Sequence, residues 1–144
     1  MTAPVEPTRR SAPSGAGHYQ RYVEQATRAG GLLRAFNRAR VIEVPDVQVA
    51  QRVSWLVRET DEAVQVAFAL VVRALRLGSV CVTLATLREE VERSLEGDLP
   101  VDLPWPDPAG WPARVARSPL VTQGATAPGL LPLRLVDGQL YLER

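Results

Sequence analysis

Hydrophobic positions in the middle of the chain have the spacing of a buried helix. Between residues 63 and 75 only Gln65 and Arg73 are polar. A helix that is apolar on almost every side belongs at the centre of a domain, so this pattern predicts a core helix that ends at about residue 77. Thr60 is the predicted N-cap of this helix, and Gly78 is the residue predicted to end it in the left-handed conformation.

Two shorter helices are predicted before this core helix. The first covers about residues 32–39, and the second runs from Pro45 or Asp46 to about Arg58. The stretch between them, residues 41–44, is predicted to be an extended link because a residue before proline avoids the helical conformation. The second helix is expected to turn one apolar stripe toward the core, formed by Val49, Val53, Leu56 and Val57.

The last thirteen residues have the pattern of a β-hairpin. Asp137 and Gly138 stand between two alternating apolar runs. An Asp-Gly pair favours a two-residue type I′ turn, because both turn positions need a positive φ angle. The second run continues to the last residue without a polar tail. This ending predicts that the chain is the front domain of a longer protein.

The order of the remaining elements suggests a fold class. A short strand is predicted at residues 80–84, and a short helix is predicted at 111–118. Between them, a capping box at Thr86 predicts the start of another helix. With the hairpin, this order predicts an α+β, mainly helical fold. A helical N-terminal part is followed by a winged-helix-like unit that ends in the C-terminal β-hairpin. The alternative is a helical cluster with an incidental hairpin.

The N-terminus differs in composition from the rest of the chain. Residues 1–17 are rich in proline, serine and glycine and are predicted to be a disordered tail. Residues 18–144 are predicted to form a single domain.

The N-terminus has no apolar run typical of a signal peptide, and the longest apolar run is too short to span a bilayer. We therefore expect no membrane association.

The residue inventory excludes several kinds of catalytic site. All 17 basic residues are arginine, so the chain can supply no phosphate-binding lysine of a P-loop. His18 and Cys81 are single and far apart, which predicts no metal site and no Cys–His pair. We expect Cys81 to be a small buried residue of a strand. A single cysteine also fits the reducing cytoplasm. No catalytic or cofactor-binding residue is predicted.

Basic residues near the C-terminus are candidates for nucleic-acid contact. In a winged helix the short helix at 111–118 would be the recognition helix, with Arg114 and Arg117 on one face and Arg134 on the wing. However, residues 89–107 contain seven acidic residues and only Arg93 as a base, a net charge of −6 (1 − 7) beside that face. Direct DNA binding is therefore the weaker alternative.

A proline-rich loop carries the candidates for a protein interface. Residues 98–113 hold five prolines together with Leu103, Trp105 and Trp111. Aromatic side chains on a stiff loop lose little entropy when a partner covers them, which is typical of interface anchors. The alternative is that both tryptophans fold back onto the core of this domain.

Several of these stretches together resemble a known family, the N-terminal domains of RecD, the alpha subunit of exodeoxyribonuclease V (the RecBCD helicase–nuclease). The resemblance covers about residues 32–144. Its most specific parts are residues 78–84 and the terminal hairpin. The matching segments are 32–35, 46–50, 62–64, 69–74, 77–84, 118–121 and 132–144.

The resemblance implies a role without catalysis for this chain. RecD proteins are ATP-dependent 5′–3′ DNA helicases that act in double-strand break repair and homologous recombination. Their ATP and Mg²⁺ sites lie in motor domains that are absent from this sequence. In the family this front domain docks the motor onto the RecC subunit, so a RecC-like partner is expected, with DNA reached only through the complex. A free-standing winged-helix DNA-binding domain is the second hypothesis, and an enzyme in its own right the third.

Overall fold

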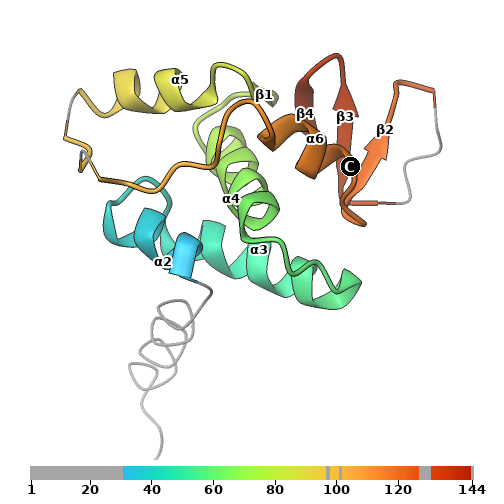
Figure 1. The fold of residues 1–144 in the computed structure, drawn as a ribbon, viewed down its shortest axis with the longest axis horizontal. Coiled ribbons are helices and arrows are strands. Elements are labelled where there is room, and N and C mark those ends of the chain that lie inside the picture. Colours follow the sequence, from blue (N-terminus) through green and yellow to red (C-terminus); the bar gives the residue numbers. More distant parts are fainter. Residues whose placement is uncertain (1–30, 97, 101, 127–130, 144) are drawn as a thin grey trace, which may run out of the picture.

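The computed structural model of the chain describes residues 31–96, 98–100, 102–126 and 131–143. The predicted tail at residues 1–17 and the predicted start of the domain at residue 18 lie outside this range. Helices and strands follow one another as predicted for an α+β fold (Figure 1). The elements are α2 (Gly31–Arg38), α3 (Val44–Val57), α4 (Glu62–Arg76), β1 (Cys81–Thr83), α5 (Leu87–Ser94), α6 (Trp111–Ala116), β2 (Val121–Gln123), β3 (Leu133–Val136) and β4 (Gln139–Leu142).

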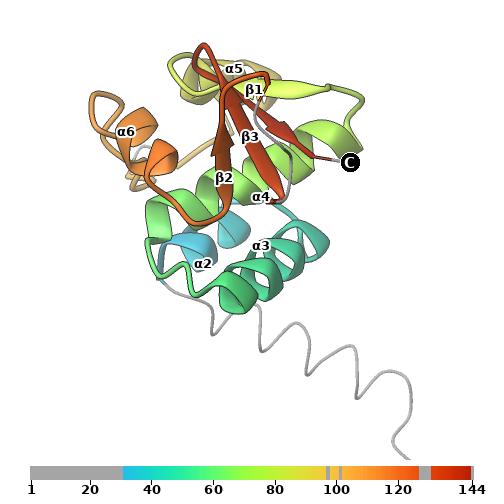
Figure 2. The same cartoon turned by 90° about the vertical axis from the view of Figure 1, so that its right-hand side faces the viewer.

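Helix α4 lies at the centre of the domain, as its composition predicts. Helices α2 and α3 lie on one side of it, and the sheet lies on the other, which Figures 1 and 2 both show. Eight of its fifteen residues are buried, including Phe68 and Leu70, each 1% exposed. The residue that ends the helix region is Gly78, whose φ of 94° confirms the predicted left-handed conformation.

The strands form one mixed sheet in the order β1-β4-β3-β2. The β1–β4 and β3–β4 pairs are antiparallel, whereas β2 and β3 are parallel. Asp137 (φ 49°) and Gly138 (φ 76°) form the predicted two-residue turn between β3 and β4. The buried face of the sheet closes over the core with Val82, Val121, Leu133 and Leu140.

Two predictions of helix starts were wrong. Val44 is the first residue of α3 and not part of an extended link. Glu43 caps this helix, and its backbone N–H donates to Oδ2 of Asp46 at 2.9 Å. The N-cap of α4 is Asp61, whose Oδ1 accepts the N–H of Ala63 at 3.0 Å, and Thr60 precedes the cap. A proline in the first turn does no harm, since the N–H that it lacks has no partner within the helix.

Helix α5 lacks the predicted capping box, and helix α6 is shorter than predicted. The side chain of Thr86 makes no capping bond to α5 and instead donates to Oε1 of Glu90 at 2.6 Å. Helix α6 ends at Ala116, two residues before the predicted Ser118.

Cys81 is half-buried on β1 rather than buried, since it lies on the outer face of the sheet opposite Tyr141.

The apolar stripe predicted for α3 faces the core only in part, because Val53 and Val57 pack against the core whereas Val49 and Leu56 are exposed. Val49 is 41% exposed and Leu56 is 66% exposed, and the buried side of α3 contains Asp46 with 0% exposure. Asp46 is buried because Arg76 of α4 holds both carboxylate oxygens, at 2.9 Å to Oδ2 and 3.3 Å to Oδ1. Such a two-point ion pair satisfies the buried charge, so the helix can turn a polar residue inward and an apolar residue outward.

Candidate functional site

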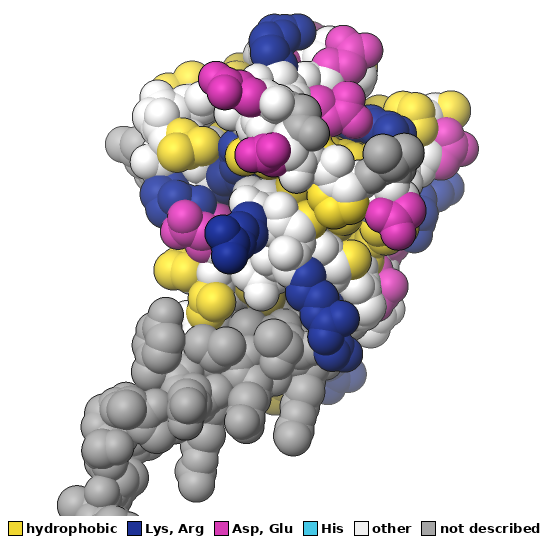
Figure 3. Space-filling model, turned by 90° about the vertical axis from the view of Figure 1, so that its left-hand side faces the viewer, with side chains coloured by type: hydrophobic (Ala, Val, Ile, Leu, Met, Phe, Trp, Pro, Cys, Tyr) yellow, Lys and Arg dark blue, Asp and Glu magenta, His cyan; other side chains and the backbone are white. Residues whose placement is uncertain are grey.

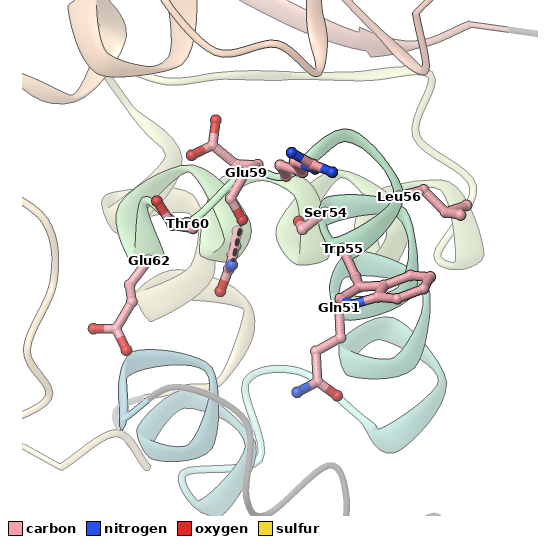
Figure 4. A pocket seen from close by; sticks show the side chains of 9 residues that line it. Gln51, Ser54, Trp55, Leu56, Glu59, Thr60 and Glu62 are labelled. Atoms are coloured by element: carbon pink, nitrogen blue, oxygen red, sulfur yellow. Dashed lines mark hydrogen bonds between the residues drawn. The ribbon is translucent and has the colours of Figure 1, made fainter.

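Two of the three most exposed large hydrophobic side chains of the described residues lie near the end of α3. Trp55 is 78% exposed and Leu56 is 66% exposed. They border an open groove of about 870 Å³ between the end of α3 and the start of α4 (Figure 4). We call this the Trp55 groove. It is lined by Gln51, Ser54, Trp55, Leu56, Arg58, Glu59, Thr60, Glu62 and Gln65.

The shape of the Trp55 groove follows from the way in which α3 ends. Arg58 adopts the left-handed conformation with φ 59°, and the N–H of Glu59 returns to the carbonyl of Ser54 at 2.8 Å. The chain therefore turns sharply into α4. In this last turn Ser54 is buried and Val57 packs against the core, whereas Trp55 lies on another side of the helix and remains outside the core.

Glu59 holds the inner wall of the groove in place. It is 8% exposed, and its carboxylate accepts the N–H of Asp61 at 2.7 Å and the hydroxyl of Ser118. The side-chain amide of Gln65 donates to the Glu59 carbonyl at 2.9 Å, as the dashed line in Figure 4 shows. A wall fixed in this way needs little ordering when a partner binds.

Trp111 and Leu103, two of the three predicted interface residues, are buried. Trp111 is 2% exposed and donates its indole N–H to the carbonyl of Ala63 at 2.8 Å, and Leu103 is 8% exposed. A partner cannot cover side chains that the domain already covers. The structure therefore corrects their assignment as surface anchors and supports the alternative that these residues pack on the core.

Trp105, the third predicted interface residue, is half-buried. Its ring lies edge-on to Phe36, with centroids 4.8 Å apart, and to Trp111, with centroids 6.5 Å apart. The guanidinium of Arg88 lies 5.9 Å from the Trp105 ring. These contacts place Trp105 between two buried aromatic rings, and because it is only half-buried, part of its ring remains exposed to solvent.

Two of the three predicted nucleic-acid contacts are paired with acidic side chains. Arg114 pairs with Asp61 through two hydrogen bonds, and Arg134 pairs with Glu143. Arg117 is exposed just after α6. On the side of the molecule that carries α2 and α5, acidic and basic side chains are interspersed (Figure 3). The two ion pairs reduce the positive charge that Arg114 and Arg134 would offer to phosphates.

The Asp61–Arg114 pair leads to a pH-dependent prediction. Burial alone would raise the pKa of Asp61, but the hydrogen bond and charge of Arg114 and the backbone N–H groups of α4 outweigh it, so the pKa lies below its ordinary value. Asp61→Asn keeps an N-cap but removes the charge. We expect it to cost about 0.5–1 kcal/mol of stability at neutral pH.

The pH profile provides the check. A depressed carboxyl pKa stabilises the fold above the unfolded value of about 3.9, and this contribution is lost as the pH falls through the folded value. Urea melts of both proteins should therefore differ at pH 7 and converge toward pH 3. A difference that stays constant over this range would show that the charge of Asp61 is not the cause.

The described residues present no arrangement typical of catalysis. No three of their His, Cys, Asp or Glu side chains come close enough together to hold a metal ion. Over the same residues, no helix has the length and apolar character that crossing a membrane requires. The geometry that stands out is therefore the exposed aromatic groove.

The described fold defines the chain as an α+β domain with an exposed aromatic groove. The family of RecBCD enzyme subunit RecD N-terminal domains matches it over residues 38–141. The chain belongs to this family, which confirms the resemblance seen in the sequence.

Curated relatives agree with this assignment. The chain is 47% identical over 123 residues to the RecBCD enzyme subunit RecD of Mycobacterium tuberculosis H37Rv, which covers 85% of this chain and 19% of the relative. It is 49% identical over 113 residues to the subunit of the same name in Mycolicibacterium smegmatis, which covers 78% of this chain and 18% of that relative. The chain thus spans about a fifth of these relatives' length. No solved structure matches it significantly.

Proposed function

We propose that this chain is the docking domain of a RecD-type helicase subunit, which attaches the motor to a RecC-like subunit. Membership of the family of RecD N-terminal domains supports a place in a RecBCD-type complex. The observation that carries the docking role is the Trp55 groove, which exposes a tryptophan and a leucine side by side. Exposed aromatic side chains in preformed clefts are the residues that contribute most to binding in protein interfaces.

The wider role follows from the same proposal. The complex would be exodeoxyribonuclease V, which would act in the cytoplasm on double-strand breaks and in homologous recombination. ATP and Mg²⁺ would bind to the motor part of the longer protein, because this chain has no lysine for a phosphate-binding loop. DNA would then reach this domain only through the assembled complex.

Removing the exposed tryptophan tests the docking role. We expect Trp55→Ala to weaken binding of the chain to a purified RecC-like subunit of the same organism by about 2 kcal/mol, the loss typical of an anchor residue. Calorimetric titration would measure the affinity. The melting temperature should change little, since Trp55 is 78% exposed. Arg117→Ala, which truncates an exposed side chain outside the groove, is the matched control and should bind as the unmodified chain does.

A free-standing winged-helix DNA-binding domain is the second candidate. The antiparallel order β1-β4-β3 and the helices between β1 and β3 favour it, because a winged helix arranges its strands in this order. Fluorescence anisotropy with duplex DNA separates the two hypotheses. Binding that persists at physiological salt and weakens in Arg117→Ala would favour the winged helix, whereas partner binding without DNA binding would support docking.

A further inference from the structure

Strand β1 forms an open edge of the sheet in the described structure. It is the terminal strand of the order β1-β4-β3-β2. The N–H of Leu84 donates to the Gly138 carbonyl at 3.2 Å, which shows that the backbone groups of Leu84 and Val82 face β4. In an antiparallel ladder every second residue turns its backbone groups away from the partner. Cys81 and Thr83 therefore direct their backbone N–H groups to the open side.

The side chains around this edge do little to protect it. Residues 77–84 contain no charged side chain, and Leu77 and Val80 are 59% and 70% exposed. Proteins usually protect an exposed edge with charges, proline or a covering element. The opposite edge shows such protection, since Pro119 precedes β2 and Gln123 donates its side-chain amide to the Ala116 carbonyl of α6 at 2.8 Å.

A pocket of about 190 Å³ lies beside the β1 edge. Its walls come from the second half of α4, from β1 and from α5, and they are mostly apolar. One wall is Arg73, which donates to the hydroxyl of Ser94 at 2.9 Å.

Among the described residues, Arg73 has no anionic partner of the kind that a partly enclosed guanidinium usually has. In the described part of the chain no carboxylate lies within 4.0 Å of it, although the ion pairs of Arg76 are close by. Burial, together with the charge of Arg76, lowers the pKa of Arg73, and Asp46 offsets only part of this effect. A guanidinium presents five donors in a planar fork that matches a carboxylate, so a carboxylate is the ligand that best fits this wall.

We propose that the edge of β1 binds an extended segment of a partner protein as an added strand, with a carboxylate side chain of that segment on Arg73. This proposal rests on the docking function and describes how docking is achieved. An added strand satisfies the outward N–H groups of Cys81 and Thr83. A three-residue edge offers few hydrogen bonds, so the side-chain contact at Arg73 is needed to hold the segment.

The charges of the pocket favour a partner segment over a second copy of this chain. Edge-to-edge pairing of two copies would bring no carboxylate to Arg73, because residues 77–84 contain none. Glu90 is the acidic side chain of the pocket, and its Oε1 accepts the hydroxyl of Thr86. Glu90 repels a carboxylate on the α5 side, which leaves Arg73 as the place where an acidic residue binds.

Amide hydrogen exchange on the 144-residue chain, with and without the RecC-like subunit, tests the added strand directly. We expect the N–H groups of Cys81 and Thr83 to exchange about tenfold more slowly, or slower still, in the complex. Cys81→Pro removes one outward donor at the first position of the strand, where proline is tolerated. Arg73→Gln removes the charge but keeps a donor for Ser94. Each variant should bind the subunit about tenfold more weakly, a loss of 1.4 kcal/mol.

The controls separate this proposal from the docking function. Arg93→Gln removes an equal charge from the exposed face of α5 and should leave the affinity unchanged. Melting curves show whether each variant is folded, and the exchange measurement needs no variant.

Binding without slower exchange at Cys81 and Thr83, or unchanged affinity of folded Arg73→Gln, would overturn the added strand but leave docking intact. No binding of the unmodified chain at all would overturn the docking function. Slower exchange that grows with chain concentration alone would assign the edge to a second copy.

Discussion

Replacing Leu70 with aspartate should unfold the domain. Leu70 lies in the middle of α4, is 1% exposed and belongs to the hydrophobic core. An unpaired carboxylate at this position loses its hydration and gains no partner, which costs several kcal/mol. A domain of this size is stable by only about 5–15 kcal/mol, so the loss is comparable with its whole stability. Circular dichroism should show little cooperative melting.

The matched control is the same substitution at Leu77, seven residues further along. Leu77 follows α4 and is 59% exposed, so aspartate there remains hydrated. We expect Leu77→Asp to melt within a few degrees of the unmodified chain. A cooperative melt of Leu70→Asp close to that of Leu77→Asp would contradict the central position of α4.

The sequence predicted the elements whose signals are local. The run of apolar residues in α4 and the Asp137-Gly138 turn both depend on neighbours along the chain, and both are confirmed. The resemblance to the family of RecD N-terminal domains is also confirmed. These elements could be predicted because the pattern that determines each of them involves no contact with a distant part of the chain.

The rotation of α3 could not be predicted because it depends on a distant partner. Asp46 turns inward only because Arg76, thirty residues later, pairs with its carboxylate. Once Asp46 is buried, the helical repeat places Leu56 and Trp55 on the outside. The sequence pattern alone favours burying Val49 and Leu56, so the groove at Trp55 was not foreseen.

The position of Trp111 in the proline-rich region also depends on a distant partner. The sequence allowed either an interface or a core position for Trp111, and composition does not decide between them. The decision comes from the carbonyl of Ala63, which accepts the indole N–H in the first turn of α4. The carbonyl belongs to a residue 48 positions away.

Trp111→Ala should produce the second largest loss of stability. The side chain is 2% exposed and closes the core between α6 and α4. Truncating a buried tryptophan to alanine leaves a cavity and costs about 3–5 kcal/mol. Trp111→Phe keeps most of the apolar contact but loses the donor to Ala63, so it should cost less, with about 0.5–1.5 kcal/mol from the hydrogen bond. Urea unfolding at neutral pH measures both losses.

Trp55→Ala is the matched control for this truncation. It removes the same atoms from a side chain that is 78% exposed, so no cavity forms and the stability should change little. The ranking expected in urea is therefore Trp111→Ala least stable, Trp111→Phe intermediate, and Trp55→Ala close to the unmodified chain. If Trp111→Ala were as stable as Trp55→Ala, Trp111 would have to lie on the surface in solution. The proline-rich loop would then again be a candidate for the docking surface, in place of the Trp55 groove.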